Sequence, residues 1–379
     1  MKKQQTPKGE KMKKLIAVIL VGFGAFLPLA CSKGATPTST TPTAQTPSGS
    51  HVNGGVVSTF AGSGSNGHAD NMNGQLATFD YPHDVTVDAA GNVFVADNSN
   101  YLIRKISPSG AVTTLAGTAG SNGYNDSSNG LLAQFNYPHG VAVDQSDNVY
   151  VADLDNQVIR EISATGAVTT LAGIGNSGYV DGSAQFARFD DPYSVAVDSS
   201  GNVYVADEYN NAIRKISNGT VSTLAGSGLV GAANGTGQAA SFHGPHGVAV
   251  DASGNVYVSD SWNNLIRKIT PAGLVSTYAG GGSTAATVTG PALSGSFNNP
   301  QGLAVDAWGT VYVADRGNNM IRAISPSGVL SVLAGQVTPG STNATGTLAS
   351  FDSPFGVAVD TAGNVYVADG NNDMIREIQ

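Results

Sequence analysis

The stretch that decides the fold runs from Pro245 to Gly280 and reads PHGVAVDASGNVYVSDSWNNLIRKITPAGLVSTYAG. Near copies of it follow one another at intervals of 53 to 56 residues through everything after Gly55. Repetition at a fixed interval indicates that similar units stack to build one structure. Each copy carries one equivalent proline, and these are Pro82, Pro138, Pro192, Pro245, Pro300 and Pro354.

Four short strands are expected in each copy. The segments GVAVD, VYVSD, LIRKI and LVSTYAG place apolar or β-branched residues at alternate positions, which is the period of a half-buried strand. Residues 251–255, DASGN, suit a tight turn between the first two strands, and residues 271–273, PAG, divide the third from the fourth. The pattern therefore predicts a meander of four antiparallel strands.

The two ends of the repeated region predict a closed ring. A four-stranded sheet of this size cannot bury both of its faces alone, so the copies must stack on one another. The last copy begins at Phe351 and stops at Gln379, after its third strand, whereas residues 55–62 match the fourth strand of the first copy. We therefore expect an all-β, six-bladed β-propeller over residues 55–379, in which strand 55–62 completes the last blade.

The copies share the pattern P-x-G-V-A-V-D-x-x-G-N-V-Y-V-A-D-x-x-N-x-x-I-R-K-I, which resembles the NHL repeat. The resemblance covers residues 55–379 and implies a six-bladed propeller. NHL-like propellers include RNA-binding modules, protein-interaction modules, receptor ectodomains and a few enzymes. The resemblance by itself therefore selects no function.

The beginning of the chain has the pattern of a secretory signal. Lys13 and Lys14 precede an apolar run over residues 15–30, and Cys31 follows directly. A charged start, a short apolar run and a small residue before the cysteine are typical of such signals, and the run is short for a membrane-spanning helix. We expect a lipoprotein-type signal peptide over residues 1–30, with translation starting at Met1 or Met12.

Residues 27–31, LPLAC, resemble a bacterial lipobox, which implies that Cys31 is lipidated; Pro28 stands where the motif prefers leucine. The alternative is a soluble secreted protein whose cysteine is incidental. The Thr/Pro/Ser-rich segment 31–54 is expected to be a flexible tether. Ser32 points to the outer membrane under enterobacterial rules. We therefore expect a monomer on the extracytoplasmic side of the bacterial cell envelope, with the lipid as its membrane contact.

The charge balance argues against binding to nucleic acid. Residues 34–379 hold 11 Lys and Arg against 26 Asp and Glu, a formal charge of −15. Affinity for phosphate backbones depends on basic residues that displace counterions. Six of the eleven cations occupy one repeated position, so few are free for such contacts. They are Arg104, Arg160, Arg214, Arg267, Arg322 and Arg376.

Two aspartates recur in every copy. One ends the second strand, seven residues before the repeated arginine, and the other lies nine residues earlier. Twelve carboxylates could serve as metal ligands or as acid–base groups. An element present in all copies more simply serves what all copies share, which is turn hydrogen bonding and Asp–Arg pairing. The first set is Asp97, Asp153, Asp207, Asp260, Asp315 and Asp369, and the second is Asp88, Asp144, Asp198, Asp251, Asp306 and Asp360.

If the repeats build the scaffold, function is expected where the copies differ. The position after the repeated proline varies most usefully, because the first strand of a propeller blade lies nearest the axis. These six side chains should therefore surround one mouth of the central channel, and we propose them as ligand-binding residues. They are His83, His139, Tyr193, His246, Gln301 and Phe355.

Three histidines in this set raise the possibility of a metal, because neutral imidazole commonly binds zinc or copper. The set resembles in this respect the peptidyl-amidoglycolate lyase domain, whose zinc is held by channel histidines. His83 and His139 lie on adjacent blades but His246 lies opposite His83, and metal–nitrogen bonds near 2 Å leave little slack. The alternative is that histidine is simply tolerated at this rim. We assign no cofactor, with a divalent metal at His83, His139 and His246 as the competing hypothesis.

The loops between the second and third strands should share that face. Two of them carry aromatic residues on neighbouring blades, Tyr209 and Trp262. Aromatic side chains supply much of the contact area at binding sites, so we expect both to be exposed anchors for a ligand or partner. The alternative is that they pack against the loops between blades.

The sequence therefore supports two functions of different classes. No nucleophile elbow, HExxH, Walker, dinucleotide-binding or CxxC motif occurs in the chain. The favoured hypothesis is a lipid-anchored, non-catalytic propeller that binds a protein, peptide or glycan at the cell envelope. The alternative is a metal-dependent lyase or hydrolase that uses the channel histidines.

Overall fold

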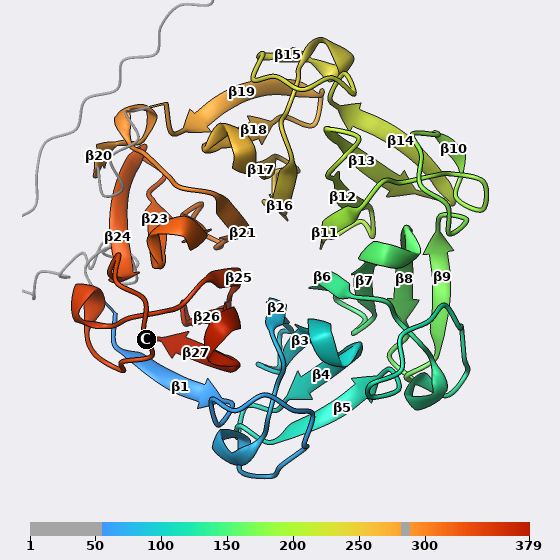
Figure 1. Cartoon of the computed structure of the whole chain (residues 1–379). Helices are drawn as coiled ribbons and strands as arrows, with labels where there is room; N and C mark the ends of the chain where they lie inside the picture. Colours follow the sequence, from blue (N-terminus) through green and yellow to red (C-terminus); the bar gives the residue numbers. More distant parts are fainter. Residues whose placement is uncertain (1–54, 282–288) are drawn as a thin grey trace, which may run out of the picture. The chain divides into compact units, whose positions relative to one another are not determined.

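The computed structural model describes residues 55–281 and 289–379, and within them six antiparallel sheets surround one axis (Figure 1). The predicted six-bladed β-propeller is confirmed. The segments for which we predicted a signal peptide (1–30), lipidation (Cys31) and a tether (31–54) lie outside the described residues. In the described part of the chain, no helix is long and apolar enough to cross a membrane.

Each blade contains four main strands that run outward from the axis in chain order. Blade 1 consists of β2 (Pro82–Val87), β3 (Val93–Asp97), β4 (Leu102–Ile106) and β5 (Val112–Ala116). Blade 2 consists of β6 (Pro138–Val143), β7 (Val149–Asp153), β8 (Val158–Ile162) and β9 (Val168–Ala172). Blade 3 consists of β11 (Pro192–Val197), β12 (Val203–Asp207), β13 (Ala212–Ser217) and β14 (Thr220–Ala225).

The remaining three blades repeat this order. Blade 4 consists of β16 (Pro245–Val250), β17 (Val256–Asp260), β18 (Leu265–Ile269) and β19 (Leu274–Ala279). Blade 5 consists of β21 (Pro300–Val305), β22 (Val311–Asp315), β23 (Met320–Ile324) and β24 (Val329–Gly335). Blade 6 consists of β25 (Pro354–Val359), β26 (Val365–Asp369), β27 (Met374–Ile378) and β1 (Val57–Ala61).

Three blades carry an additional two-residue strand on their outer edge, which the repeat pattern did not predict. These strands are β10 (Gly182–Ser183), β15 (Gly235–Thr236) and β20 (Gly290–Pro291). They belong to the loops that enter blades 3, 4 and 5, whose sequences differ from copy to copy. Covering an outer strand in this way protects unpaired backbone groups at a sheet edge.

Strand β1 closes the ring. It pairs antiparallel with β27, with Val57 opposite Ile378 and Thr59 opposite Arg376. The first described strand thus completes the last blade, as the sequence predicted. The approach is close, because a side-chain carbon at Gly55 would lie 2.5 Å from a methyl group of Ile378.

The hydrophobic core lies between neighbouring blades. Val and Ile side chains of one blade pack against Ala and Tyr side chains of the next, as Val195 and Val205 do against Ala142 and Tyr150. One phenylalanine at the entry to each blade is also buried, as predicted for Phe79 and its equivalents. Because each sheet needs its neighbour to cover it, burial in this fold depends on ring closure.

The repeated aspartates and arginines form buried pairs within each blade. In blade 1, Arg104 donates to Asp97 at 2.6 Å and to the backbone oxygen of Thr78, and its guanidinium lies over the ring of Phe79. The same aspartate accepts the backbone N–H of Asp80. All six Asp–Arg pairs have completely buried side chains and N–O distances of 2.6 to 3.0 Å. The structural interpretation of these residues is confirmed.

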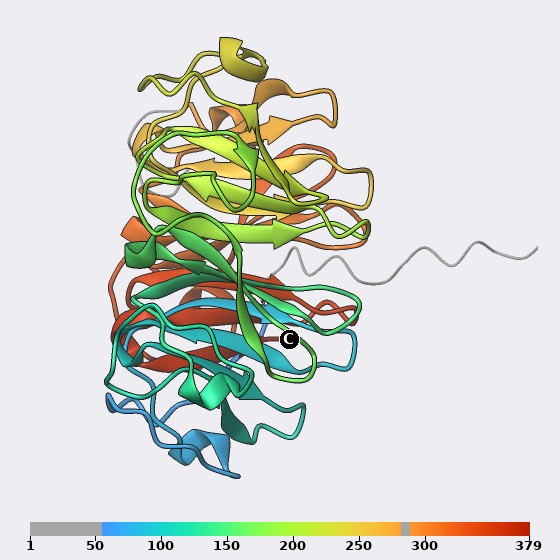
Figure 2. The ribbon, with the colours of Figure 1, turned by 90° about the vertical axis from the view of Figure 1, so that its right-hand side faces the viewer.

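The second set of aspartates shapes the turns between the first and second strands. Asp251, for example, accepts backbone N–H groups from Ser253 and Asn255. These hairpin turns define what we call the turn face of the propeller; the opposite face, which carries the loops between the second and third strands, is the loop face. Figure 2 shows the propeller edge-on, with hairpin turns extending to the right.

Side-chain hydrogen bonds join consecutive blades at the loop face. A residue after each second strand adopts a left-handed conformation, and in five blades its side chain accepts the N–H that precedes the next repeated proline. Asn264, for example, accepts from Asn299 N–H at 2.7 Å. Between blades 1 and 2 the two positions are Tyr101 and Tyr137, whose rings meet edge to face at 5.2 Å. That junction therefore lacks the amide contact that the others have.

Candidate functional site

The six side chains after the repeated prolines meet at the axis, as predicted, but they fill it. The ring centroids of His83 and His139 are 3.4 Å apart, those of His139 and Tyr193 3.9 Å, and those of Tyr193 and His246 4.0 Å. Phe355 lies 3.9 Å from His83 on the other side. We call the six residues His83, His139, Tyr193, His246, Gln301 and Phe355 the plug. Five of its members are buried and Tyr193 is half-buried.

A hydrogen-bond network fixes one side of the plug. The Gln301 amide donates to Asn299, so its oxygen is free to accept, and it receives the Tyr193 hydroxyl at 2.8 Å. That oxygen also lies 3.0 Å from His246 Nδ1, which must therefore carry a hydrogen. The plug is held by directed contacts as well as by packing.

The contact between His246 and Glu208 requires a proton. With Nδ1 as the donor, a neutral His246 would turn the lone pair of Nε2 toward Glu208 Oε1, which lies 3.3 Å away. Two acceptors facing each other in a buried site repel, so either the imidazole or the carboxyl holds an additional hydrogen. A charged pair or a protonated acid therefore lies directly below the loop face.

The histidines do not converge on one point. Tyr193 stacks parallel to His246 and also contacts His139, so it lies between the two imidazoles. Among residues 55–281 and 289–379, no group of three or more His, Cys, Asp or Glu side chains is arranged to hold one metal ion. Burial lowers the pKa of His83 and of His139 well below the usual range, with a further contribution from the neighbouring histidines. Both rings are neutral at pH 7.

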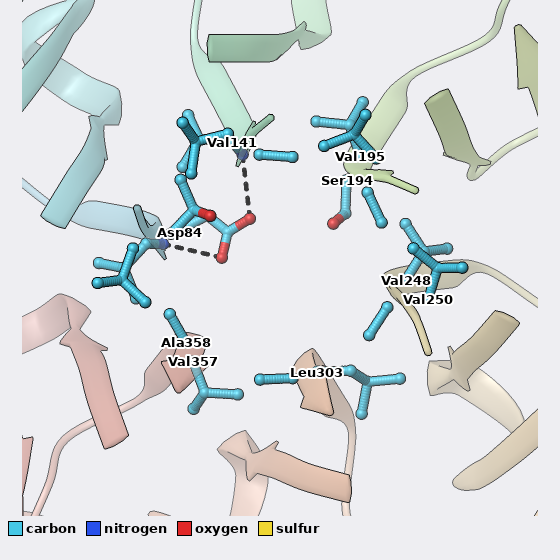
Figure 3. Close-up of a pocket in the computed structure, with 18 of the residues that line it drawn as sticks. Asp84, Val141, Ser194, Val195, Val248, Val250, Leu303, Val357 and Ala358 are labelled. Atoms are coloured by element: carbon cyan, nitrogen blue, oxygen red, sulfur yellow. Dashed lines mark hydrogen bonds between the residues drawn. The ribbon is translucent and has the colours of Figure 1, made fainter. Parts of the chain in front are cut away.

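A channel lies beneath the plug. Its cavity is about 170 Å³ and is walled by the innermost strands of all six blades, β2, β6, β11, β16, β21 and β25. Valine, alanine and leucine supply most of the wall, and the polar side chains that line it are Asp84, Thr86 and Ser194. The view along the axis shows Asp84 and Ser194 pointing into this space from different blades (Figure 3).

Asp84 also joins two blades. Its carboxylate accepts Val85 N–H at 2.9 Å and, across the junction, Val141 N–H at 3.1 Å. This is the junction at which Tyr101 and Tyr137 replace the amide contact. Removal from water outweighs these two hydrogen bonds and raises the pKa of Asp84 to about 7.

The aromatic pair, Tyr209 and Trp262, lies exposed on the loop face, as predicted. Tyr209 is 54% exposed and Trp262 is 45% exposed, and their ring centroids are 6.2 Å apart. The backbone N–H of Tyr209 donates to Asp190, and that of Trp262 donates to His243. One face of Trp262 packs over Gly244 and its edge meets the His243 ring, so packing against the loop between blades and exposure occur together.

Sequence analysis missed Asp84, Ser194, Glu208 and Arg316 as parts of the axial region. The guanidinium of Arg316 lies 4.3 Å from the centre of the Phe355 ring and covers the plug. A signal was present for the first two residues, because the other four copies have glycine at their position. The glycines are Gly140, Gly247, Gly302 and Gly356.

Comparisons with known proteins agree with this architecture. The family model of the NHL repeat matches five segments, namely residues 79–106, 135–160, 189–216, 242–269 and 297–323. The chain is 30% identical over 282 residues to SUPPRESSOR OF QUENCHING 1 of Arabidopsis thaliana, a match that covers 69% of this chain and 26% of that protein. The chain thus spans about a quarter of the length of this relative.

Two solved structures share the fold. A structural genomics protein of unknown function from Bacteroides thetaiotaomicron superimposes with a TM-score of 0.67 at 21% identity, over 85% of this chain and 75% of that one. An auxiliary nutrient binding protein from Bacteroides ovatus gives a TM-score of 0.63 at 15% identity, over 86% and 77% of the two chains. With five repeat matches on six closed blades, the chain belongs to the NHL-repeat β-propeller family.

Proposed function

We propose that this protein is a non-catalytic binding propeller that recognises a protein, peptide or glycan on its loop face. The observation that carries the proposal is the aromatic pair, which exposes about half of each ring on adjacent blades. Its backbone is fixed by hydrogen bonds to the neighbouring loops. Large aromatic surfaces on a rigid support bind ligands with little loss of conformational entropy.

The proposal extends to the place of action. We propose that Cys31 carries a lipid and that residues 31–54 tether the propeller to the bacterial envelope, on the outer membrane. Likeness to a Bacteroides protein described as an auxiliary nutrient binding protein is an analogy of fold, which makes an extracytoplasmic binding role a reasonable starting point. Labelling with a radioactive fatty acid, compared between the full-length chain and Cys31→Ser, tests the lipid attachment directly.

The proposed ligand surface can be tested with the protein's own fluorescence. The chain has two tryptophans, Trp262 and Trp308, so Trp308→Phe leaves Trp262 as the only tryptophan reporter. A panel of soluble oligosaccharides and short peptides is titrated against this variant. We expect a saturable change in emission for at least one member of the panel, and at least a tenfold loss of affinity when Tyr209→Ala is added.

The control is Tyr124→Ala, which removes an exposed tyrosine that is paired with Thr170 in the outer part of blade 2. It should leave the titration unchanged. Binding that survives loss of both Tyr209 and Trp262, followed by calorimetry, would contradict the proposal. A stoichiometric transition metal in the protein purified without chelators, lost in the triple variant of His83, His139 and His246 to Ala, would favour the metal-dependent enzyme instead.

A further inference from the structure

The channel differs from the loop face in chemistry and in access. The plug fills the axis at its loop-face end, so the cavity is bounded there by His83, Tyr193, His246, Gln301 and Phe355. At the other end the walls continue into the hairpin turns of the turn face, where Val87 is followed by Asp88 and Val250 by Asp251. A ligand of the channel would therefore enter from the turn face.

A departure from the repeat equips this cavity with a charge. Four blades have glycine two residues after the repeated proline, where neighbouring inner strands approach so closely that a Cβ at Gly247 would lie 2.3 Å from the Gln301 oxygen. Blades 1 and 3 instead have Asp84 and Ser194, and both side chains turn into the channel (Figure 3). The apolar wall is thus interrupted by one carboxyl and one hydroxyl from separate blades.

No basic side chain neutralises Asp84 within the described residues. Its hydrogen-bond donors are two backbone N–H groups, and it forms no ion pair there. The turn face adds negative charge, because Asp88, Asp144 and Asp360 line the groove at one side of the mouth and Asp251 and Asp306 line the groove at another. A field of one sign at a mouth with low-dielectric walls concentrates the opposite charge.

We propose that the channel is a binding site for a small primary alkylammonium ion. The ammonium group would donate to Asp84 and to the Ser194 hydroxyl, and the alkyl chain would lie against the valine and leucine side chains of the wall. A cavity of about 170 Å³ has the volume of about six water molecules in the liquid, which suits a chain of a few carbons. A mostly apolar pocket with few convergent polar groups is the usual form of a small-ligand site.

An alkylammonium ion fits this site better than a hard metal ion does. Calcium and magnesium need six or more oxygen ligands or several retained waters, whereas one carboxylate and hydroxyl groups are what the channel offers. An ammonium has three donors and needs only that many acceptors, and its carbon chain gains from the apolar wall. Burial of the unpaired carboxyl, which keeps its pKa near 7, agrees with a site completed by an incoming cation.

The experiment is calorimetric titration of the full chain with n-butylammonium chloride, with n-butanol as the neutral ligand of the same shape. We expect saturable binding of the amine and binding at least tenfold weaker for the alcohol. At pH 6 the amine should also release protons, because it favours the ionised form of Asp84; titrations in two buffers of different ionisation enthalpy measure this release.

Two variants locate the site. Asp84→Asn keeps the shape of the side chain and removes the charge, and it should lower amine affinity at least tenfold. Ser194→Val keeps Asp84 but narrows the cavity and removes the hydroxyl, so it should weaken binding as well. Circular dichroism and a thermal melt establish that each variant is folded, and Asp181→Asn on the outer surface is the control that should bind like the native chain.

The proposal is overturned if the native chain binds no amine, if butanol binds equally well, or if folded Asp84→Asn binds the amine as before. In the first case Asp84 serves only to join blades 1 and 2. Because the aromatic pair lies on the other side of the plug, these results do not depend on whether the loop face binds its own ligand.

Discussion

Every blade places the same aspartate and arginine in its interior, whereas the six side chains that meet at the axis are of four kinds: histidine, tyrosine, glutamine and phenylalanine. The interior pairs are completely buried and each is satisfied by backbone groups of its own blade. The axial residues instead contact residues from other blades, as Tyr193 of blade 3 does with Gln301 of blade 5. The first region is a local solution that can be copied, and the second is decided once for the whole ring.

This contrast separates scaffold from candidate function. A residue that recurs in all six copies meets a need that all six share, and the Asp–Arg pairs meet the need to fasten the blade entry. A residue that departs from its copies answers to its position on the ring. Asp84 combines both roles, because it replaces a missing contact between two blades and also supplies the charge of the channel.

The largest expected effect comes from breaking an interior pair. Asp207→Asn leaves the completely buried Arg214 without its anionic partner, and the loss of one member of a buried pair typically costs about 3–5 kcal/mol. Urea unfolding measures the change. Asp181→Asn removes the other carboxylate on the same arginine, but that side chain is 43% exposed, so the expected cost is below about 1 kcal/mol. Equal losses from the two changes would contradict the distinction between inner and outer carboxylates.

The next largest effect concerns the pH dependence that Asp84 confers. Its pKa is about 7 in the folded protein and near 3.8 as a free carboxyl, so between these pH values the folded chain binds more protons than the unfolded chain. The contribution of Asp84 to stability is therefore complete below pH 4 and is lost as pH rises to 7, by up to about 4 kcal/mol.

The measurement is the difference in unfolding free energy between Asp84→Asn and the native chain at several pH values. This difference cancels the other titrating groups, including His83 and His139, whose lowered pKa values act in the opposite direction below pH 6.5. We expect the variant to gain relative stability from pH 4 to pH 7. A constant difference would mean that the carboxyl is ionised throughout and that the channel is well hydrated.

The smallest expected effect concerns the contacts between blades. Asn264→Gly keeps the left-handed conformation but removes the acceptor for Asn299 N–H, which should cost about 1 kcal/mol in unfolding free energy. Asn218→Gly is the matched control, because Asn218 is also left-handed but lies in an exposed turn of blade 3. If both changes are neutral, the contact between blades 4 and 5 depends on core packing alone.

The sequence by itself determined the number of blades, the order of their strands and the way in which the ring closes. Alternating apolar residues specify strands, fixed spacing specifies stacked units, and the unmatched fourth strand at residues 55–62 specifies the closing pair with β27. The buried roles of the aspartates and arginines also followed, because six copies of one local arrangement report on the same environment. All these features depend on residues close together in the chain or on exact repetition.

Only the tertiary structure decided what the axis contains. The sequence brought His83, His139 and His246 to one end of the channel, but whether their rings leave a mouth, hold a metal or stack into a plug depends on distances across the ring. Tyr193 lies between two of them, and Gln301 fixes the hydrogen on the third. The channel with Asp84 and Ser194 arises in the same way, because six strands from distant parts of the chain must close before a cavity exists between them.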